Sequence, residues 1–168
     1  MSSETITTAL FLITAVVASA VLINAVYPVI QTMTGTFSSS THESDVRIRT
    51  DFKIIATSAS QSSGTAQVWM KNIGSERISL SEIQRADVFC GAVGNFDHLS
   101  YTNSSLVDSK WTEDFGPGYD LNTNSFWDPG ETLKVTAKPT TQIHSRDNIY
   151  FQFALPNGIW RSNEFTAS

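Results

Sequence analysis

One acidic stretch of the sequence carries side chains whose types and spacing could hold a metal ion. From Asp120 the chain reads DLNTNSFWDPGE, with oxygen donors at its first, third, fifth, seventh, ninth and twelfth positions. The donors are side chains, or for Phe126 the backbone carbonyl: Asp120, Asn122, Asn124, Phe126, Asp128 and Glu131. The same positions bind Ca²⁺ in an EF-hand loop, because Ca²⁺ prefers hard oxygen ligands. The spacing therefore predicts a structural Ca²⁺ site.

The same stretch has a second interpretation as a metal-free turn. The sixth position is Ser125, where an EF-hand loop has glycine for its sharp turn, and the flanking segments look like strands instead of helices. Asp128-Pro129-Gly130 is also a common turn sequence leading into a strand at Leu133. At the level of sequence both interpretations stay open.

Residues suited to catalysis are scattered along the chain. His42, His98 and His144 are far apart, and the single cysteine, Cys90, lies in an apolar segment that predicts a buried, inert thiol. The sequence contains no nucleophile motif G-x-S-x-G, no zinc-ligand spacing and no phosphate-binding glycine loop. These patterns predict that the protein is not an enzyme and has no cofactor other than Ca²⁺.

The charge balance excludes another class of partner. The chain has 16 acidic and 11 basic residues, a net charge of −5, and no basic cluster. A nucleic-acid-binding protein would need such a cluster. We therefore predict no nucleic-acid partner.

Asn103 is a candidate glycosylation site. The sequence Asn103-Ser104-Ser105 fits the N-glycosylation pattern. The pattern matters only if the domain faces the outside of the cell, and single matches are common by chance.

An apolar N-terminal segment comes before all of these residues. Residues 9–30 form a run of 22 residues without a charged side chain, and about 20 apolar residues suffice for a helix to cross a membrane. The acidic Glu4 and the length of the run argue against a cleaved signal peptide. We predict a helix at residues 1–34 that either spans a membrane or packs with copies of itself.

Several residues of this helix are candidates for assembly contacts. Ala15 and Ser19 have the small-xxx-small spacing that lets helices approach closely. Glu4 either interacts favourably with the helix dipole or binds the amino terminus of a neighbouring subunit. The candidate assembly residues are Glu4, Phe11, Ala15, Ala18, Ser19 and Leu22.

A β-domain is predicted after the helix. Pro28 is expected to kink or end the helix, residues 35–43 with their Ser/Thr cluster at 38–41 to form a polar linker, and residues 44–168 to form one domain. Apolar and polar residues alternate from Val46 to Ala56, at residues 66–70 and at residues 149–155. About seven to nine short strands separated by turns predict an antiparallel β-sandwich, and an α+β fold class for the whole chain.

The domain is rich in aromatic residues, with four Trp and ten Phe in the chain. We expect most of them to lie in the core. The alternative is that some of them form an interaction patch on the surface.

Several longer stretches carry a resemblance to a known family. MSSETITTALFLITAVVASAVLINAVYPVI is followed by VWMKNIGSERISLSEIQRADVFCGAVGNF, and later by WDPGETLKV and FALPNGI. Together they resemble the archaeal flagellar (archaellum) accessory protein G (FlaG) family, which is related to FlaF and to type IV pilin-like filament subunits. The block from Lys71 to Phe96 is the most specific part of the match.

The resemblance implies both a fold and a set of partners. It implies a pilin-like helix and an immunoglobulin-like β-sandwich held outside the cytoplasmic membrane, in the pseudoperiplasm. It also implies a stator role, filament formation through the helix, and a FlaF-like partner that contacts the surface layer. It implies no catalytic residue. Unlike pilins and archaellins, the sequence has no basic leader ending in glycine, which argues against prepilin-peptidase processing.

We therefore expect a structural assembly protein of the archaellum. Its helix would pack with copies of itself or sit in the membrane, and its β-domain would bind partners outside. One alternative is a membrane-tethered module that recognises an envelope protein or glycan without polymerising. Another is a subunit of the main archaellum or pilus filament, located in an extracellular filament.

Overall fold

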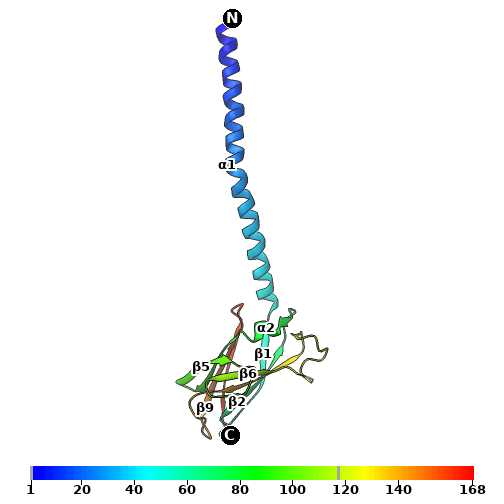
Figure 1. Ribbon diagram of the computed structural model, residues 1–168, viewed down its shortest axis with the longest axis vertical. Coiled ribbons are helices and arrows are strands. Elements are labelled where there is room, and N and C mark those ends of the chain that lie inside the picture. The colour runs from blue at the N-terminus through cyan, green and yellow to red at the C-terminus, as the bar shows by residue number, and fades with distance from the viewer. Residues whose placement is uncertain (1, 117) are drawn as a thin grey trace. The chain divides into compact units, whose positions relative to one another are not determined.

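The computed structural model describes residues 2–116 and 118–168 and divides the chain into two compact units (Figure 1). The first unit extends to Asp45, and the second is Val46–Ser168. The described residues of the first unit are helical, and all strands of the described chain lie in the second unit.

The helix α1 (Ser2–Arg49) is continuous over 48 residues. Glu4 lies in its first turn and Arg47 and Arg49 in its last, where each charge interacts favourably with the helix dipole. The segment predicted as a helix at residues 1–34 is helical over its described residues, and the helix continues past the predicted end. Pro28 is inside the helix and does not end it.

The polar linker predicted at residues 35–43 is wrong as a break in secondary structure, because these residues are helical. The hydroxyls of Thr36 and Thr41 donate to the carbonyls of Thr32 and Phe37, both at 2.8 Å. Hydroxyl side chains bonded in this way do not compete with the helix for its N–H groups. The side chains of Ser38 and Ser39, part of the predicted Ser/Thr cluster, lie outside the described residues.

The start of the first strand was also predicted too early. Val46 and Ile48 belong to the last turn of α1, and the strand begins at Phe52. A spacing of two residues over so short a segment does not distinguish a strand from a helix end. The side-chain hydroxyl and the N–H of Thr50 both bond to the carbonyl of Val46, at 2.7 and 3.0 Å, which closes the helix.

The second unit contains ten strands and one short helix among its described residues. They are β1 (Phe52–Ser60), β2 (Thr65–Asn72), β3 (Ile78–Ser79), α2 (Leu80–Ile83), β4 (Asp87–Ala92), β5 (Asn95–Tyr101), β6 (Lys110–Asp114), β7 (Phe126–Trp127), β8 (Thr132–Lys138), β9 (Asn148–Ala154) and β10 (Trp160–Thr166). The helix α2 was not predicted; a capping box between Ser79 and Glu82 stabilises it.

Eight strands form one sheet in the order β1-β2-β8-β6-β5-β4-β9-β10, and β3 pairs with β7. Each pairing is antiparallel except the short parallel pair of β5 and β6. The C-terminal Ser168 connects the two ends of the sheet: its N–H donates to Ala59 (3.0 Å), and its carbonyl accepts from Gln61 (3.3 Å). The sheet thus folds back on itself, and the predicted sandwich-like, mostly antiparallel domain is confirmed.

The core lies between the folded-back parts of this sheet. Every second residue of β2, β8 and β9 is buried, including Val68, Val135 and Phe151. Trp111 and Trp127 are fully buried, and Phe52 packs edge-on to Phe153 at a centroid distance of 5.6 Å. Burying one large apolar side chain contributes roughly 1.5–3 kcal/mol, so these aromatic residues supply much of the stability of the domain.

Candidate functional site

The six candidate assembly residues are all exposed on α1. Glu4, Phe11, Ala15, Ala18 and Leu22 follow one another at spacings of three, four or seven residues, so they lie on one face of the helix, with Ser19 beside them. Phe11 is 71 % exposed and Leu22 64 %. All residues of the charge-free run, 9–30, are exposed. An apolar surface of this size requires a partner or a membrane to cover it.

The hydroxyl groups of α1 are compatible with such a covered environment. Thr7, Thr8, Thr14, Ser19 and Thr32 each donate to the carbonyl four residues earlier, at 2.8–2.9 Å. These hydroxyls need no water to satisfy their donors, so the helix can enter an apolar medium without leaving them unpaired.

The acidic loop predicted to bind Ca²⁺ is closed by its own hydrogen bonds. Asp120 and Glu131 are 7 % and 5 % exposed. The two oxygens of Asp120 accept from the N–H groups of Asn124 (3.3 Å) and Ser125 (3.0 Å). Those of Glu131 accept from Leu121 (2.9 Å) and Asp128 (3.0 Å). Both carboxylates thus compensate backbone donors that the irregular loop would otherwise leave unpaired.

The third carboxylate of the loop binds two asparagine side chains. The amide nitrogens of Asn122 and Asn124 each donate to one oxygen of Asp128, at 2.7 Å. These hydrogen bonds are the main reason that the pKa of Asp128 lies below its usual value of 3.8. Ser125, at the position where an EF-hand has glycine, adopts a left-handed backbone with φ of 62°.

The loop therefore brings together the predicted ligands, Asp120, Asn122, Asn124, Phe126, Asp128 and Glu131, but in an arrangement unlike a metal cage. Asn122 and Asn124 present amide nitrogens to Asp128, whereas Ca²⁺ would need their oxygens. Within residues 2–116 and 118–168, no group of three His, Cys, Asp or Glu side chains has metal-site geometry. Ca²⁺ binding stays a prediction from spacing.

Asn72 positions this loop, and sequence reasoning did not identify it. It is fully buried, and its amide nitrogen donates to the carbonyls of Glu76 (2.9 Å) and Trp127 (2.8 Å). Its side-chain oxygen accepts from the N–H of Gly74 at 3.0 Å. The local signal for its burial is the alternation of β2, because Asn72 follows Met70 at the same spacing of two residues and therefore lies on the buried face. Asn72 ties the acidic loop to the segment that follows β2.

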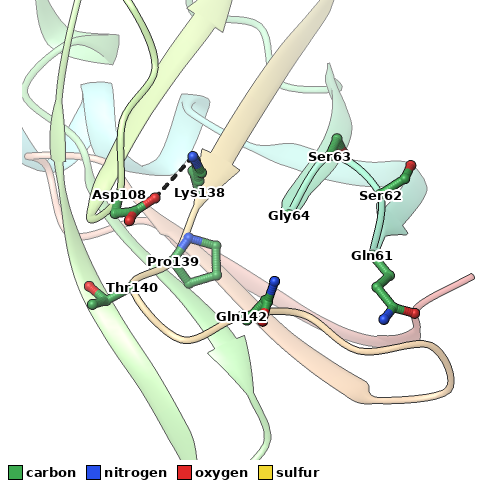
Figure 2. A pocket seen from close by; sticks show the side chains of 9 residues that line it. All are labelled: Gln61, Ser62, Ser63, Gly64, Asp108, Lys138, Pro139, Thr140 and Gln142. Carbon is green, nitrogen blue, oxygen red and sulfur yellow. Dashed lines mark ion pairs between the residues drawn. The ribbon is translucent and has the colours of Figure 1, made fainter.

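A polar hollow of about 440 Å³ lies at the β1–β2 turn (Figure 2). Figure 2 shows Gln61, Ser62 and Ser63 on one side and Asp108, Lys138, Pro139, Thr140 and Gln142 across from them. Lys138 pairs with Asp108 at 3.0 Å, so the two charges neutralise each other. The lining offers hydrogen bonds but no nucleophile with an adjacent base.

The remaining candidates are separate from one another. Cys90 is fully buried, and burial raises the pKa of its thiol to about 12, so the prediction of a buried, inert cysteine is confirmed. His98 pairs with Asp87 (2.9 Å) and His144 with Asp147 (3.3 Å) at separate surface positions. Asn103 is exposed in the loop after β5, where a glycan would be accessible, and its modification stays a prediction.

The aromatic residues divide between core and surface. Of the four Trp, Trp111 and Trp127 are core residues and Trp160 is 53 % exposed. On the outer faces of β4, β5 and β9, four rings form a surface cluster, in which the centroids of Phe96 and Tyr150 are 4.9 Å apart and so are those of Phe89 and His98. The prediction that most Trp and Phe side chains lie in the core is wrong, because only five of the fourteen are buried and the rest are partly or fully exposed. The buried ones are Phe52, Trp111, Trp127, Phe151 and Phe153.

The sequence and fold of this chain are similar to those of known proteins. Residues 2–165 match the family model of archaeal-type flagellin. The archaellum periplasmic stator protein FlaG from Sulfolobus acidocaldarius has 24 % identity and a TM-score of 0.54, over 69 % of this chain and 99 % of that one. The archaellum periplasmic stator protein complex of FlaF and FlaG from the same organism has 23 % identity and a TM-score of 0.53, and the match covers 68 % of this chain and 87 % of the chain in that structure. The archaeal flagellum of Methanospirillum hungatei strain JF1 has 15 % identity and a TM-score of 0.54, and the match covers 91 % of this chain and 90 % of the chain in that structure. These structures share the fold of this chain.

Proposed function

The chain belongs to the archaeal-type flagellin family and is a structural component of the archaellum, and we propose that it forms filaments of the stator through α1. In this proposal α1 packs against copies of itself, and the β-domain binds a partner outside the cytoplasmic membrane. The expected absence of enzymatic activity agrees with a family of structural proteins.

One observation carries the proposal: the charge-free run of α1 is exposed along its whole length. Its large apolar residues are exposed on every side of the helix, from 44 % at Val26 to 71 % at Phe11. A helix that is apolar all round is stable only when it is surrounded by lipid or other helices. Copies of the same helix, with small residues on one face, provide such surroundings outside a membrane.

The chain offers little to hold α1 permanently in a bilayer. Between Glu4 and Glu43 the sequence has no Lys or Arg, the residues that anchor a span at the membrane surface. We propose that the helix is held in the cytoplasmic membrane before assembly and enters the filament afterwards, with the β-domain outside the membrane in both states.

The proposed partner of the β-domain is a FlaF-like protein. Support comes from the fold, since one chain of a solved complex of FlaF and FlaG shares its fold with 68 % of this chain. A link from that partner to the surface layer is part of the proposal.

Truncation tests the filament mechanism. The full-length chain is expected to form filaments visible by electron microscopy, whereas a chain beginning at Ser44 is expected to stay soluble and unpolymerised. The truncated chain keeps the complete core of the second unit, so loss of assembly would not reflect unfolding. Polymers formed by the truncated chain would refute the helix-driven mechanism.

The same electron microscopy also tests two alternative functions. The likeness to the Methanospirillum hungatei flagellum extends over 91 % of this chain, helix included, which favours a subunit of the main filament as the second candidate. Long filaments with flagellar symmetry would support that role. Membrane-bound particles without filaments would indicate a tethered module that binds an envelope protein or glycan.

A further inference from the structure

One position in the apolar run of α1 combines two unpaired polar groups. Asn24 is the only residue with a side-chain amide between Ala9 and Ile30, and it is exposed. The Thr14 and Ser19 hydroxyls in the same run donate to their own helix, at 2.9 and 2.8 Å. The amide of Asn24 has no hydrogen-bond partner among the described residues. An amide has two N–H donors and an acceptor oxygen, which α1 itself leaves unused.

The second unpaired group is the backbone carbonyl of the same residue. In an α-helix this carbonyl accepts from the N–H four residues later, and that residue is Pro28, which has no N–H. The hydroxyl of Thr32 donates to Pro28 (2.9 Å), one turn further on, and no Ser or Thr hydroxyl of the described helix donates to Asn24. Because Pro28 has no N–H, the backbone carbonyl of Asn24 lacks its usual donor within the helix.

These groups are inexpensive to expose in water but costly in an apolar environment. A donor or acceptor that is buried without a partner destabilises the buried state. Lipid chains supply neither donors nor acceptors, whereas another α1 supplies both at the same residue. The amide donors and the free carbonyl acceptor are complementary between two copies of the chain.

We propose that Asn24 hydrogen-bonds to α1 of a second copy of the chain and thereby sets the axial offset at which neighbouring helices pack. This inference rests on the proposed self-association of α1 and adds the residue that makes the association specific. An apolar surface alone permits many sliding offsets, because apolar packing has little directionality. A polar pair satisfied at one offset makes the others unfavourable.

Self-association in vesicles tests the contact directly. Full-length chains labelled at the amino terminus with donor or acceptor dyes are placed in phosphatidylcholine vesicles, and energy transfer is measured while lipid dilutes the protein. Asn24→Leu is expected to weaken association by about 3- to 20-fold, the range of measured interhelical side-chain hydrogen bonds. Thr14→Val is the matched control, because that hydroxyl is already bonded within α1; we expect its effect to be less than about 2-fold.

The results separate this inference from the proposed function. Association of Asn24→Leu as tight as that of the original chain, or an equal loss in Thr14→Val, overturns the role of Asn24. In electron micrographs, filaments of Asn24→Leu should show several subunit arrangements where the original chain shows one, and a single unchanged arrangement also overturns it. Absence of filaments from the original chain overturns the proposed function, while the vesicle measurement still decides the contact.

Discussion

At the scale of single residues, Asn72 is the polar group on which most of the local structure depends. Its side chain bonds to Gly74, Glu76 and Trp127, and its backbone bonds to Gly130 and Glu131. The side chain is fully buried, so bulk solvent does not compete for its hydrogen bonds.

Replacing Asn72 with alanine is expected to destabilise the domain by about 2–3 kcal/mol, because two carbonyls and one N–H lose their partner inside the protein. Urea unfolding of the chain measures the loss. Asn163→Ala, on exposed β10, is the matched control and should change the unfolding free energy by less than about 0.5 kcal/mol. Equal effects of the two changes would contradict the assigned role of Asn72.

Tyr101 makes the stability of the domain sensitive to alkaline pH. Burial, aided by a hydrogen bond from its hydroxyl to Glu113 (2.8 Å), raises the pKa of Tyr101 from 10.0 to about 12. In the unfolded chain Tyr101 loses its proton near pH 10, whereas in the folded chain it keeps the proton until about pH 12. The folding stability linked to Tyr101 is therefore complete below pH 10 and is lost as pH rises to about 12.

The unfolding free energy, measured by urea titration at several pH values, should fall between pH 10 and 12. Tyr101→Phe removes the titrating hydroxyl and should make this fall shallower, although Cys90 contributes a decline in the same direction. An identical pH profile for the variant would show that Tyr101 is not responsible.

At the scale of elements, the acidic loop is stabilised by backbone caps. Asp120→Ala is expected to cost about 1–2 kcal/mol even with excess chelator, because the N–H groups of Asn124 and Ser125 lose their acceptor. Thermal unfolding with chelator measures this loss. If the variant is destabilised only when Ca²⁺ is present, the loop acts as a metal site and the capping explanation is wrong.

Calorimetry of the original domain with Ca²⁺ tests the ligand spacing separately. Binding heat, together with a melting temperature lowered by chelator, would support the Ca²⁺ site. Absence of both would leave the metal-free turn as the explanation of the loop.

The turn after β2 contacts the last turn of α1 too closely to admit a side chain. The N–H groups of Ser75 and Glu76 donate to the carbonyl of Arg49, at 2.9 and 3.2 Å. A methyl group at Gly74 would lie 2.6 Å from the amide nitrogen of Asp51 and closer still to the carbonyl oxygen of Arg49.

Gly74→Ala should therefore destabilise the domain by about 1–3 kcal/mol, the usual cost of overpacking. Gly116→Ala is a suitable control, because the nearest atom to an added methyl group there is 3.8 Å away. Chemical denaturation of the two variants makes the comparison, and similar stabilities would contradict the close contact at Gly74.

At the scale of the whole molecule, we assign assembly to α1 and independent folding to the β-domain. The β-domain has its own core of buried residues, and the described members of that core all lie between Phe52 and Ala167. Association through α1 can thus change without loss of the domain fold.

A chain beginning at Ser44 should consequently unfold at nearly the same temperature as the β-domain of the full-length protein. Calorimetry of both chains, the longer one in detergent and the shorter one with and without that detergent, provides the comparison. A large decrease in the truncated chain would show that α1 supports the domain.

How much was predictable differs between parts of the chain. The alternation in residues 66–70 and 149–155 correctly predicted buried strand faces, and the buried Cys90 followed from its apolar neighbours. The acidic loop was identified as a unit, but the pairing of Asp128 with two asparagines was not. Ligand spacing shows which oxygens are near one another, and it does not show which donors they face.

The sequence by itself determined the properties that neighbouring residues encode. Absence of charge from Ala9 to Ile30 determined an apolar helix that must be covered, and period-two alternation determined a β-domain. Only the tertiary structure decided that the helix continues to Arg49, that β5 and β6 are parallel, and that Asn72 holds the acidic loop. The parallel pair and the contacts of Asn72 depend on hydrogen bonds between residues distant in sequence, for which local patterns carry little information. The helix continues through local bonds from each N–H to the carbonyl four residues earlier, which the polar composition of residues 35–43 did not indicate.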